Sequence, residues 1–187
     1  MSGQAGRYQR SMSGLFGALL VSLLVIGGYV GFRALNRDEL DVRPEPIELA
    51  EAVTVGEQAG ARPTYPDPLP KGWTATSFDT GSPDAPAWGL GLNTREGAYV
   101  GVRREDAELD QLLETYVDKA PEEGRTVRLG GELAGRWQTW TDAGGDSAYG
   151  RKVGQDWLLV YGSAPSRDLR RVVESLTEKV TPPTPAP

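Results

Sequence analysis

The longest apolar stretch of the chain lies near its start. No residue from 11 to 32 is charged, and the run Leu15–Ile26 is apolar at almost every position. At about 1.5 Å per helical residue, the uncharged stretch reaches roughly 33 Å, which matches the apolar thickness of a bilayer. The pattern predicts one transmembrane helix over residues 11–33, an uncleaved signal anchor. A cleaved signal peptide and a buried core helix are the alternatives.

Prolines and polar residues divide the rest of the chain. We expect a tail at residues 1–10, a stalk at 34–46, one folded domain at 47–178 and a disordered Pro-rich tail at 179–187. Residues 47–60 fit a strand by their alternation, but their Ala, Leu and Glu content favours a helix, which we expect. The four prolines of residues 62–70 argue against regular structure there.

Periodicity within the folded domain predicts strands and two helices. The helices are expected to follow Asp106 and Ser166, each residue capping its helix. Residues 157–161 are apolar on both faces, which is typical of a central strand covered on each side. Together these patterns predict an α+β fold, an antiparallel sheet with helices on one face, preceded by one transmembrane helix. The expected strands are 73–78, 88–92, 98–102, 126–129, 135–141, 148–153 and 156–161.

Charge is divided unevenly along the chain. Residues 1–37 carry four Arg and no acid, whereas the remainder holds 16 of the 20 basic residues and all 26 acidic ones, a net charge of −10. A short basic tail kept inside with a long acidic domain outside is the common arrangement for a signal anchor. We therefore expect a protein embedded in the cell membrane, with its N-terminus cytoplasmic and its C-terminal domain outside. The acidic domain argues against binding of nucleic acid or anionic lipid.

The chain contains neither Cys nor His. Disulfides, thiolate or imidazole metal sites and a Ser-His-Asp triad are thereby excluded. Carboxylates are the only plentiful acid/base groups, so an enzyme would use two of them across a cleft. The acids at 105–110 fit a helix start, those at 122–123 a loop, and Asp142 with Asp146 a hairpin turn. We expect no catalytic, cofactor-binding or metal-binding residue.

Aromatic residues provide the candidate interaction surface. Trp137 and Trp140 lie three apart on one expected strand, so they point to opposite faces of the sheet. If helices cover one face, the other Trp, with Tyr149 across the hairpin, forms an exposed aromatic patch able to bind a glycan or a protein partner. The alternative is that both Trp are buried.

Small residues mark one side of the expected anchor. Gly17, Gly27, Gly28 and Gly31 gather there, and Gly27 with Gly31 forms a G-x-x-x-G. Such a stripe lets another helix approach closely, so one hypothesis is that the anchor packs against itself or a partner helix. The alternative is that glycine is simply tolerated in membrane helices.

Several short motifs occur along the chain in a fixed order. They are Arg10-Ser11-Met12, Leu69-Pro70-Lys71-Gly72-Trp73, Trp88–Leu92 with Gly97-Ala98-Tyr99, Gly135-Arg136-Trp137, and Tyr161–Ala164 with Leu169 and Ser175-Leu176. Their order resembles that of a known family, the actinobacterial single-pass membrane proteins called domain of unknown function 4245. The resemblance implies a membrane-anchored architecture and an envelope location. It implies no activity, so no functional residue is carried over.

The functional expectation combines these points. We expect a single-pass, membrane-anchored extracytoplasmic module for interaction, sensing or scaffolding in the cell envelope, without catalytic activity and with a membrane or envelope protein as its possible partner. One alternative is a carboxylate-dependent envelope hydrolase. Another is an accessory subunit of a membrane complex, joined through the anchor helix.

Overall fold

A computed structural model describes Ile26 and residues 44–179 of the chain. The chain divides into two units, Met1–Val42 and Arg43–Pro187, and the fold described below belongs to the second. Apart from Ile26, the expected anchor at 11–33, including Gly17, Gly27, Gly28 and Gly31, lies outside the described residues. Among the residues described, none of the helices has both the length and the apolar character needed to span a membrane.

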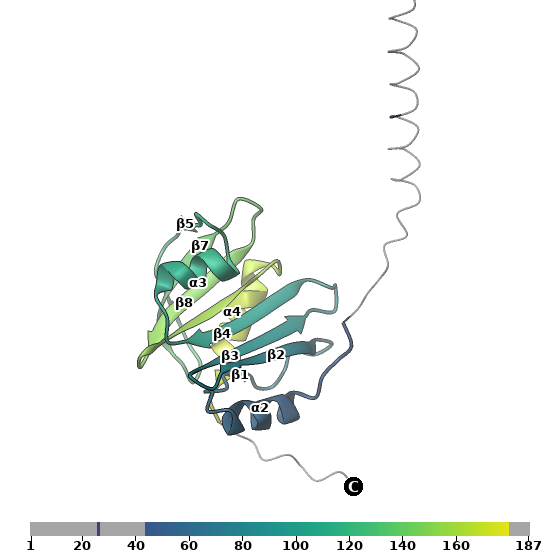
Figure 1. The fold of residues 1–187 in the computed structure, drawn as a ribbon. Coiled ribbons are helices and arrows are strands. Elements are labelled where there is room, and N and C mark those ends of the chain that lie inside the picture. Colours follow the sequence, from purple (N-terminus) through teal and green to yellow (C-terminus); the bar gives the residue numbers. More distant parts are fainter. Residues whose placement is uncertain (1–25, 27–43, 180–187) are drawn as a thin grey trace, which may run out of the picture. The chain divides into compact units, whose positions relative to one another are not determined.

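The folded unit alternates strands with short helices (Figure 1). The helix expected within 47–60 is confirmed, and strands lie at each of the expected positions. The helices are α2 (Leu49–Gln58), α3 (Leu109–Tyr116) and α4 (Ser166–Ser175). The strands are β1 (Tyr65–Pro66), β2 (Thr74–Ser82), β3 (Ala85–Asn93), β4 (Tyr99–Glu105), β5 (Glu122–Glu123), β6 (Val127–Leu129), β7 (Gly135–Thr141), β8 (Ser147–Val153), β9 (Asp156–Gly162) and β10 (Leu176–Thr177).

Two antiparallel meanders form the main sheet. Its strand order is β2-β3-β4-β9-β8-β7-β5, with β6 also paired to β7. The last strand of the first meander, β4, pairs with the last strand of the second, β9, and Val102 lies opposite Val160 at this junction. A separate two-stranded pair joins β1 to β10, so the expectation that 62–70 lacks regular structure is wrong at Tyr65 and Pro66.

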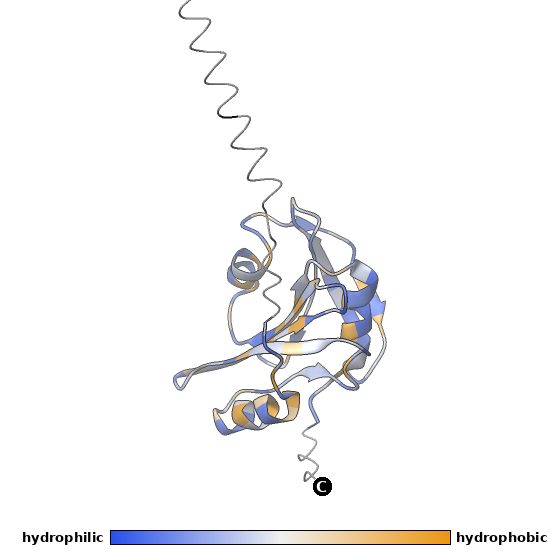
Figure 2. Cartoon of the chain, turned by 90° about the vertical axis from the view of Figure 1, so that its right-hand side faces the viewer, coloured by the Kyte–Doolittle hydropathy of each residue, from blue (hydrophilic) through white to orange (hydrophobic). Residues whose placement is uncertain are grey.

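Helices cover both faces of the sheet, which corrects the expectation of helices on one face. On one face, α2 and α4 enclose the larger core, which includes Val53, Trp88 and Leu169. On the other, Leu113 of α3 packs against Leu159 and its neighbours in a smaller core. Figure 2 shows the sheet between helices on its two sides. The cause lies in β9, whose Leu158, Leu159 and Val160 are all buried and so need cover on each side.

The expected helix caps are also corrected. The N-cap residue of α3 is Glu108 rather than Asp106, and it makes no side-chain capping bond. For α4 the cap position belongs to Pro165, because Ser166 is already helical. The hydroxyl of Ser166 instead lies 2.7 Å from the hydroxyl of Tyr149, so it ties α4 to β8.

Candidate functional site

The aromatic residues expected to form an exposed patch are buried. Trp137 has an exposed fraction of 0%, Trp140 of 5% and Tyr149 of 7%. Trp137 and Tyr149 belong to the larger core, whereas Trp140 belongs to the smaller core beside α3. The two Trp do point to opposite faces, but both faces are covered, so an exposed patch of these residues is not formed.

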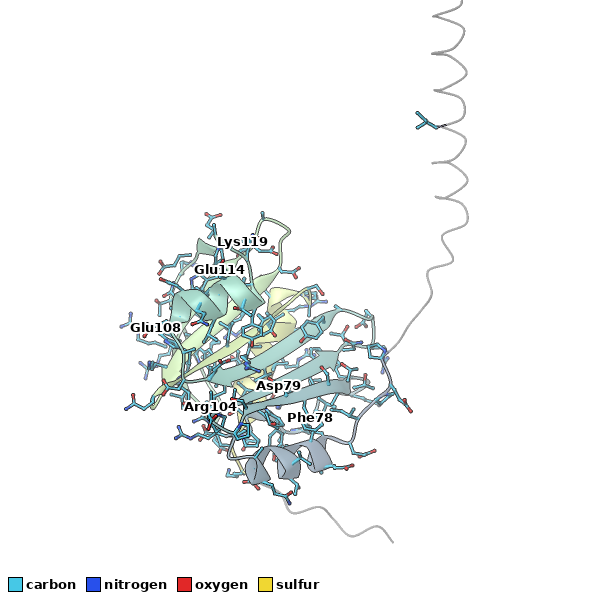
Figure 3. All side chains as sticks on the ribbon, viewed as in Figure 1. Phe78, Asp79, Arg104, Glu108, Glu114 and Lys119 are labelled. Atoms are coloured by element: carbon cyan, nitrogen blue, oxygen red, sulfur yellow. The ribbon has the colours of Figure 1, made fainter. Side chains whose placement is uncertain are left out.

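We call the face of the sheet on which α3 packs the α3 face. The helix covers only part of it, and a concave surface lies on the uncovered part. The side chains around it are Ser77 and Asp79 of β2, Tyr99 and Arg103 of β4, Tyr116 of α3 and Tyr161 of β9. We call these six residues the tyrosine groove. Its volume is about 240 Å³. Figure 3 shows Asp79 on the part of the sheet that lies beside α3.

Glycines on the central strands leave room for the tyrosine rings. A Cβ atom added to Gly101 would overlap the ring of Tyr161, and one added to Gly91 would lie 3.3 Å from the ring of Tyr99. Gly91 and Gly101 lie directly opposite each other in the β3–β4 pair. Because neither has a side chain, the two rings can lie low over the neighbouring strand, and this arrangement makes the floor of the groove shallow and aromatic.

The three tyrosines form one cluster. The ring centroids of Tyr116 and Tyr161 are 5.4 Å apart, and those of Tyr99 and Tyr161 are 6.2 Å apart. Tyr99 is 38% exposed, so part of its ring faces solvent. Phe78 borders the same groove, but its ring packs against Trp88, which belongs to the core on the opposite face.

Arg103 and its two carboxylate partners form the polar side of the groove. Its guanidinium pairs with Asp79, and its Nε donates a hydrogen bond to Oε2 of Glu105 at 2.8 Å. The guanidinium also lies 5.2 Å from the ring centroid of Tyr116, a cation–π distance. These two carboxylates and one guanidinium sum to one negative charge. The groove therefore has no spare positive charge with which to bind an anion.

Burial and nearby groups shift the pKa values of several of these residues. Burial raises the pKa of Tyr161, and nearby Tyr99 adds to this effect. Burial also raises the pKa of Tyr116, although the charge of Arg103 opposes the rise. The hydrogen bond from Arg103 lowers the pKa of Asp79 despite partial burial. At neutral pH Tyr116 and Tyr161 thus carry neutral phenol hydroxyls and Asp79 an ionised carboxylate, and groups of these kinds can hydrogen-bond a ligand.

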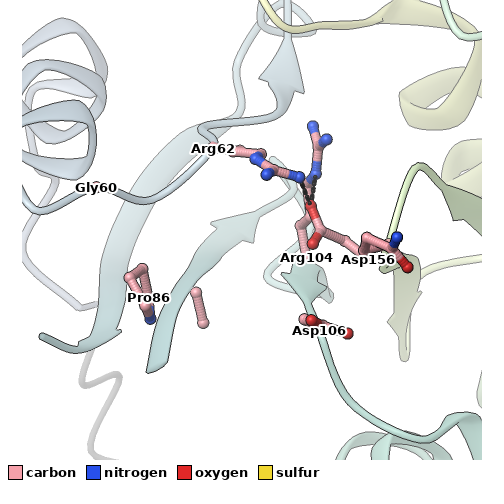
Figure 4. A pocket seen from close by; sticks show the side chains of 8 residues that line it. Gly60, Arg62, Pro86, Arg104, Asp106 and Asp156 are labelled. Carbon is pink, nitrogen blue, oxygen red and sulfur yellow. Dashed lines mark hydrogen bonds and ion pairs between the residues drawn. The ribbon is translucent and has the colours of Figure 1, made fainter. Parts of the chain in front are cut away.

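A second concave site of about 240 Å³ lies where β4 ends and β9 begins, and it is lined by Arg62, Arg104, Asp106 and Asp156 (Figure 4). Oδ2 of Asp156 accepts hydrogen bonds from Arg104 at 2.8 Å and from Arg62 at 3.0 Å. Arg104 also donates to Thr64 Oγ1 at 3.1 Å and pairs with Glu178. The guanidinium of Arg104 and the carboxylate of Asp156 are thus engaged within the chain, which explains this pair as a structural clamp.

The other acidic candidates have local roles. The backbone N–H of Asp146 donates to Oδ1 of Asp142 at 2.7 Å, which closes the β7–β8 turn as expected. Asp106 borders the clamp beside Asp156, whose carboxylate pairs with two arginines. Within the described part of the chain, no group of three or more acidic residues could hold a metal ion.

Glycines on two neighbouring strands were a signal for the groove in the sequence. Gly89 and Gly91 alternate on β3, and Gly101 on β4 lies opposite Gly91, so three neighbouring positions on one face of the sheet lack side chains. Glycine inside a strand often marks a close approach of another group. Only the strand pairing shows that these glycines share a face with Tyr99 and Tyr161.

No curated protein and no solved structure matches the chain. A family model described as Protein of unknown function (DUF4245) matches residues 7–176. This match covers most of the chain, including every strand of the main sheet. The chain therefore belongs to the DUF4245 family of proteins of unknown function.

Proposed function

We propose that this protein is a non-catalytic binding module of the cell envelope whose tyrosine groove binds a neutral saccharide unit. The observation that carries the proposal is the groove itself, a shallow aromatic surface with hydrogen-bonding groups at its edges. The carbon–hydrogen face of a sugar ring packs well on a tyrosine ring, while its hydroxyls need donors and acceptors beside that ring. Tyr99, Asp79 and Ser77 supply both kinds of contact.

Charge and size narrow the ligand class. Arg103 is already paired with two carboxylates, so an anionic ligand would have to displace one of them. The volume of about 240 Å³ is below the usual range of pockets for drug-sized ligands, which favours one ring of a longer, mostly solvated chain. A neutral saccharide meets both conditions.

The proposal also includes the location of the module. The uncharged stretch at residues 11–32, with its basic flanks, supports a transmembrane anchor, and the acidic remainder supports an outward orientation. Such an arrangement would hold the binding domain on the outer side of the cell membrane, close to envelope glycans. Added protease on intact cells should then digest residues 44–179 and leave an epitope tag on residues 1–10 protected. Protection of the domain instead would contradict this orientation.

The binding test uses a matched pair of variants. Tyr99 and Val55 are both 38% exposed, but Val55 lies on α2 and does not line the groove. The full chain, in a detergent without a sugar headgroup, would be titrated by saturation-transfer NMR with glucose-, galactose-, mannose- and N-acetylglucosamine-based oligosaccharides. We expect saturable binding of at least one of them.

Tyr99→Ala should weaken that binding by roughly tenfold, because a stacked ring contributes on the order of 1 kcal/mol or more. Val55→Ala should change the affinity less than about twofold, since its side chain lies outside the groove. Equal losses in both variants, or no saturable binding by any sugar in the panel, would refute the saccharide site.

A further inference from the structure

Cationic side chains form a row on the part of the α3 face that β6, β7 and β8 build. Arg128 of β6 lies directly opposite Arg136 of β7. The β7–β8 pairing ends with Gln138 opposite Gly150, and Arg136 and Lys152 each lie two residues beyond this pair, on the same face of the sheet. Trp157 of β9 lies opposite Lys152. We call Arg128, Arg136, Lys152 and Trp157 the cationic row.

Such a row carries an electrostatic cost. Like charges directly opposite each other on neighbouring strands repel. None of the ion pairs formed among residues 44–179 involves Arg128, Arg136 or Lys152. The row ends at Glu105 of β4, but Arg103 already binds that carboxylate. These cations therefore stand together on a domain whose overall charge is negative.

The row borders a concave surface. Arg136, Lys152 and Trp157 line it together with Gln138, Gly150 and Thr126, and its volume is about 420 Å³. The ammonium of Lys152 lies 5.8 Å from the ring centroid of Trp157. Arg151 also lines this surface, but its guanidinium donates to the carbonyl oxygens of Leu133 and Ala134. The surface combines exposed cations with one half-buried aromatic ring.

We propose that the cationic row binds a phosphorylated sugar, with the phosphate held by Arg136 and Lys152 and the sugar ring against Trp157. A phosphate monoester carries a charge of about −1.5 to −2 near pH 7 and offers three acceptor oxygens, so it matches several cations better than a carboxylate does. The volume leaves room for a ring beside the phosphate. This site shares no lining residue with the tyrosine groove, so the two proposals stand or fall separately.

The test follows tryptophan fluorescence of the full chain in a neutral detergent that carries neither sugar nor phosphate. The probes are glucose 6-phosphate, glucose and inorganic phosphate. We expect a saturable change with glucose 6-phosphate that Trp157→Phe abolishes. Glucose should give none, and inorganic phosphate should bind about tenfold or more weakly because it lacks the ring. Binding should strengthen as pH rises through about 6, where the phosphate loses its second proton.

Two double variants separate a specific site from bulk charge. Arg136→Gln with Lys152→Gln should weaken glucose 6-phosphate binding by roughly tenfold to a hundredfold, the loss expected for charge-assisted hydrogen bonds. Arg167→Gln with Arg170→Gln removes the same charge from exposed positions on α4 and should change the affinity less than about twofold. The first pair should fold at least as stably as the wild type, because it relieves repulsion, and circular dichroism checks this.

Three results would overturn the proposal: equal losses in the two double variants, equal binding of glucose and glucose 6-phosphate, or equal binding of inorganic phosphate. If the first double variant does not fold, Lys152→Gln alone replaces it. Lys152 is exposed, so this change leaves the strands intact.

Discussion

Tyr161 owes its position to a glycine on the neighbouring strand. Its ring occupies the space that a Cβ atom of Gly101 would need. Its phenol is largely buried, which is why its pKa is raised. A single missing methyl group on β4 thus decides where the aromatic floor of the tyrosine groove lies.

We expect Gly101→Ala to destabilise the folded unit. The added methyl group overlaps a rigid ring, so Tyr161 must move, and overpacking of this kind costs about 1–3 kcal/mol. Urea unfolding of the full chain measures the loss. Gly130→Ala is the control, because a Cβ atom there meets nothing within 4 Å. Equal stability of the two variants would show that the Tyr161 ring moves aside without loss of stability, and this would contradict the prediction.

For single residues, the sequence predicted which face of the sheet a side chain occupies. It did not predict whether other elements cover that face. The spacing of Trp137 and Trp140 placed them correctly on opposite faces. Their burial depends on α3, which comes from a distant part of the chain and packs near Trp140 but leaves Tyr99 partly exposed. Alternation along one strand carries no information about that choice.

Among the elements, α3 contributes most to the shape of the groove. It covers the neighbouring part of the same sheet face and supplies Tyr116. Its N-cap residue, Glu108, has extended dihedral angles (φ −72°, ψ 138°) but makes no side-chain capping bond. Glutamate is too long for the usual bond to the first helical N–H groups, whereas aspartate fits it. The start of α3 therefore lacks the stabilisation that a side-chain cap would provide.

Glu108→Asp should stabilise the protein by roughly 0.5–1 kcal/mol, because the shorter carboxylate can cap the helix without a change of charge. The shift of the urea unfolding midpoint measures this gain. Glu114→Asp makes the same substitution inside α3, where no cap is needed, and should give no gain. A gain of equal size there would mean that the effect is not capping.

The turn between β7 and β8 carries the pH-dependent prediction. Burial and the charge of Asp142 raise the pKa of Asp146 above its usual value. The folded state therefore binds this proton more tightly than the unfolded state. The contribution of Asp146 to stability then declines as pH rises from the unfolded pKa, about 3.9, through the raised folded pKa.

Asp146→Asn removes that titration but keeps the backbone N–H that closes the turn. It should flatten the decline and raise stability near neutral pH by no more than a few tenths of a kcal/mol, because solvent screens this partly exposed site. Urea unfolding between about pH 3 and 7 measures both effects. A steeper decline in the variant would contradict the assignment.

The sequence predicted most elements because each has a local signal. The α3 and α4 stripes and the strand alternation are examples. The short pair of Tyr65–Pro66 with Leu176–Thr177 had none, because its partners are far apart in the chain and only tertiary structure brings them together. The side on which each helix lies was missed for the same reason.

For the whole molecule, the Arg104–Asp156 clamp joins segments from the start, middle and end of the fold. Arg104 and Asp156 have side chains only 7% and 11% exposed, and Arg104 reaches both Thr64 and Glu178. Asp156→Ala should cost about 3–5 kcal/mol, because it leaves a buried guanidinium without its main partner. Thermal or urea unfolding measures the loss.

The control for the clamp is Arg170→Gln, which removes an exposed ion pair with Glu174 on α4. It should change stability by less than about 0.5 kcal/mol, since exposed pairs contribute little. Similar losses in both variants would mean that the clamp does not hold the fold together.

Binding of a saccharide over the tyrosine groove can be measured by ¹⁹F NMR of the fluorotyrosine-labelled full chain. Tyr→Phe variants assign the resonances. On addition of the saccharide that binds, we expect the resonances of Tyr99, Tyr116 and Tyr161 to shift, whereas those of the core residues Tyr65 and Tyr149 stay in place. Shifts confined to Tyr65 and Tyr149, or no shift at saturation, would contradict it.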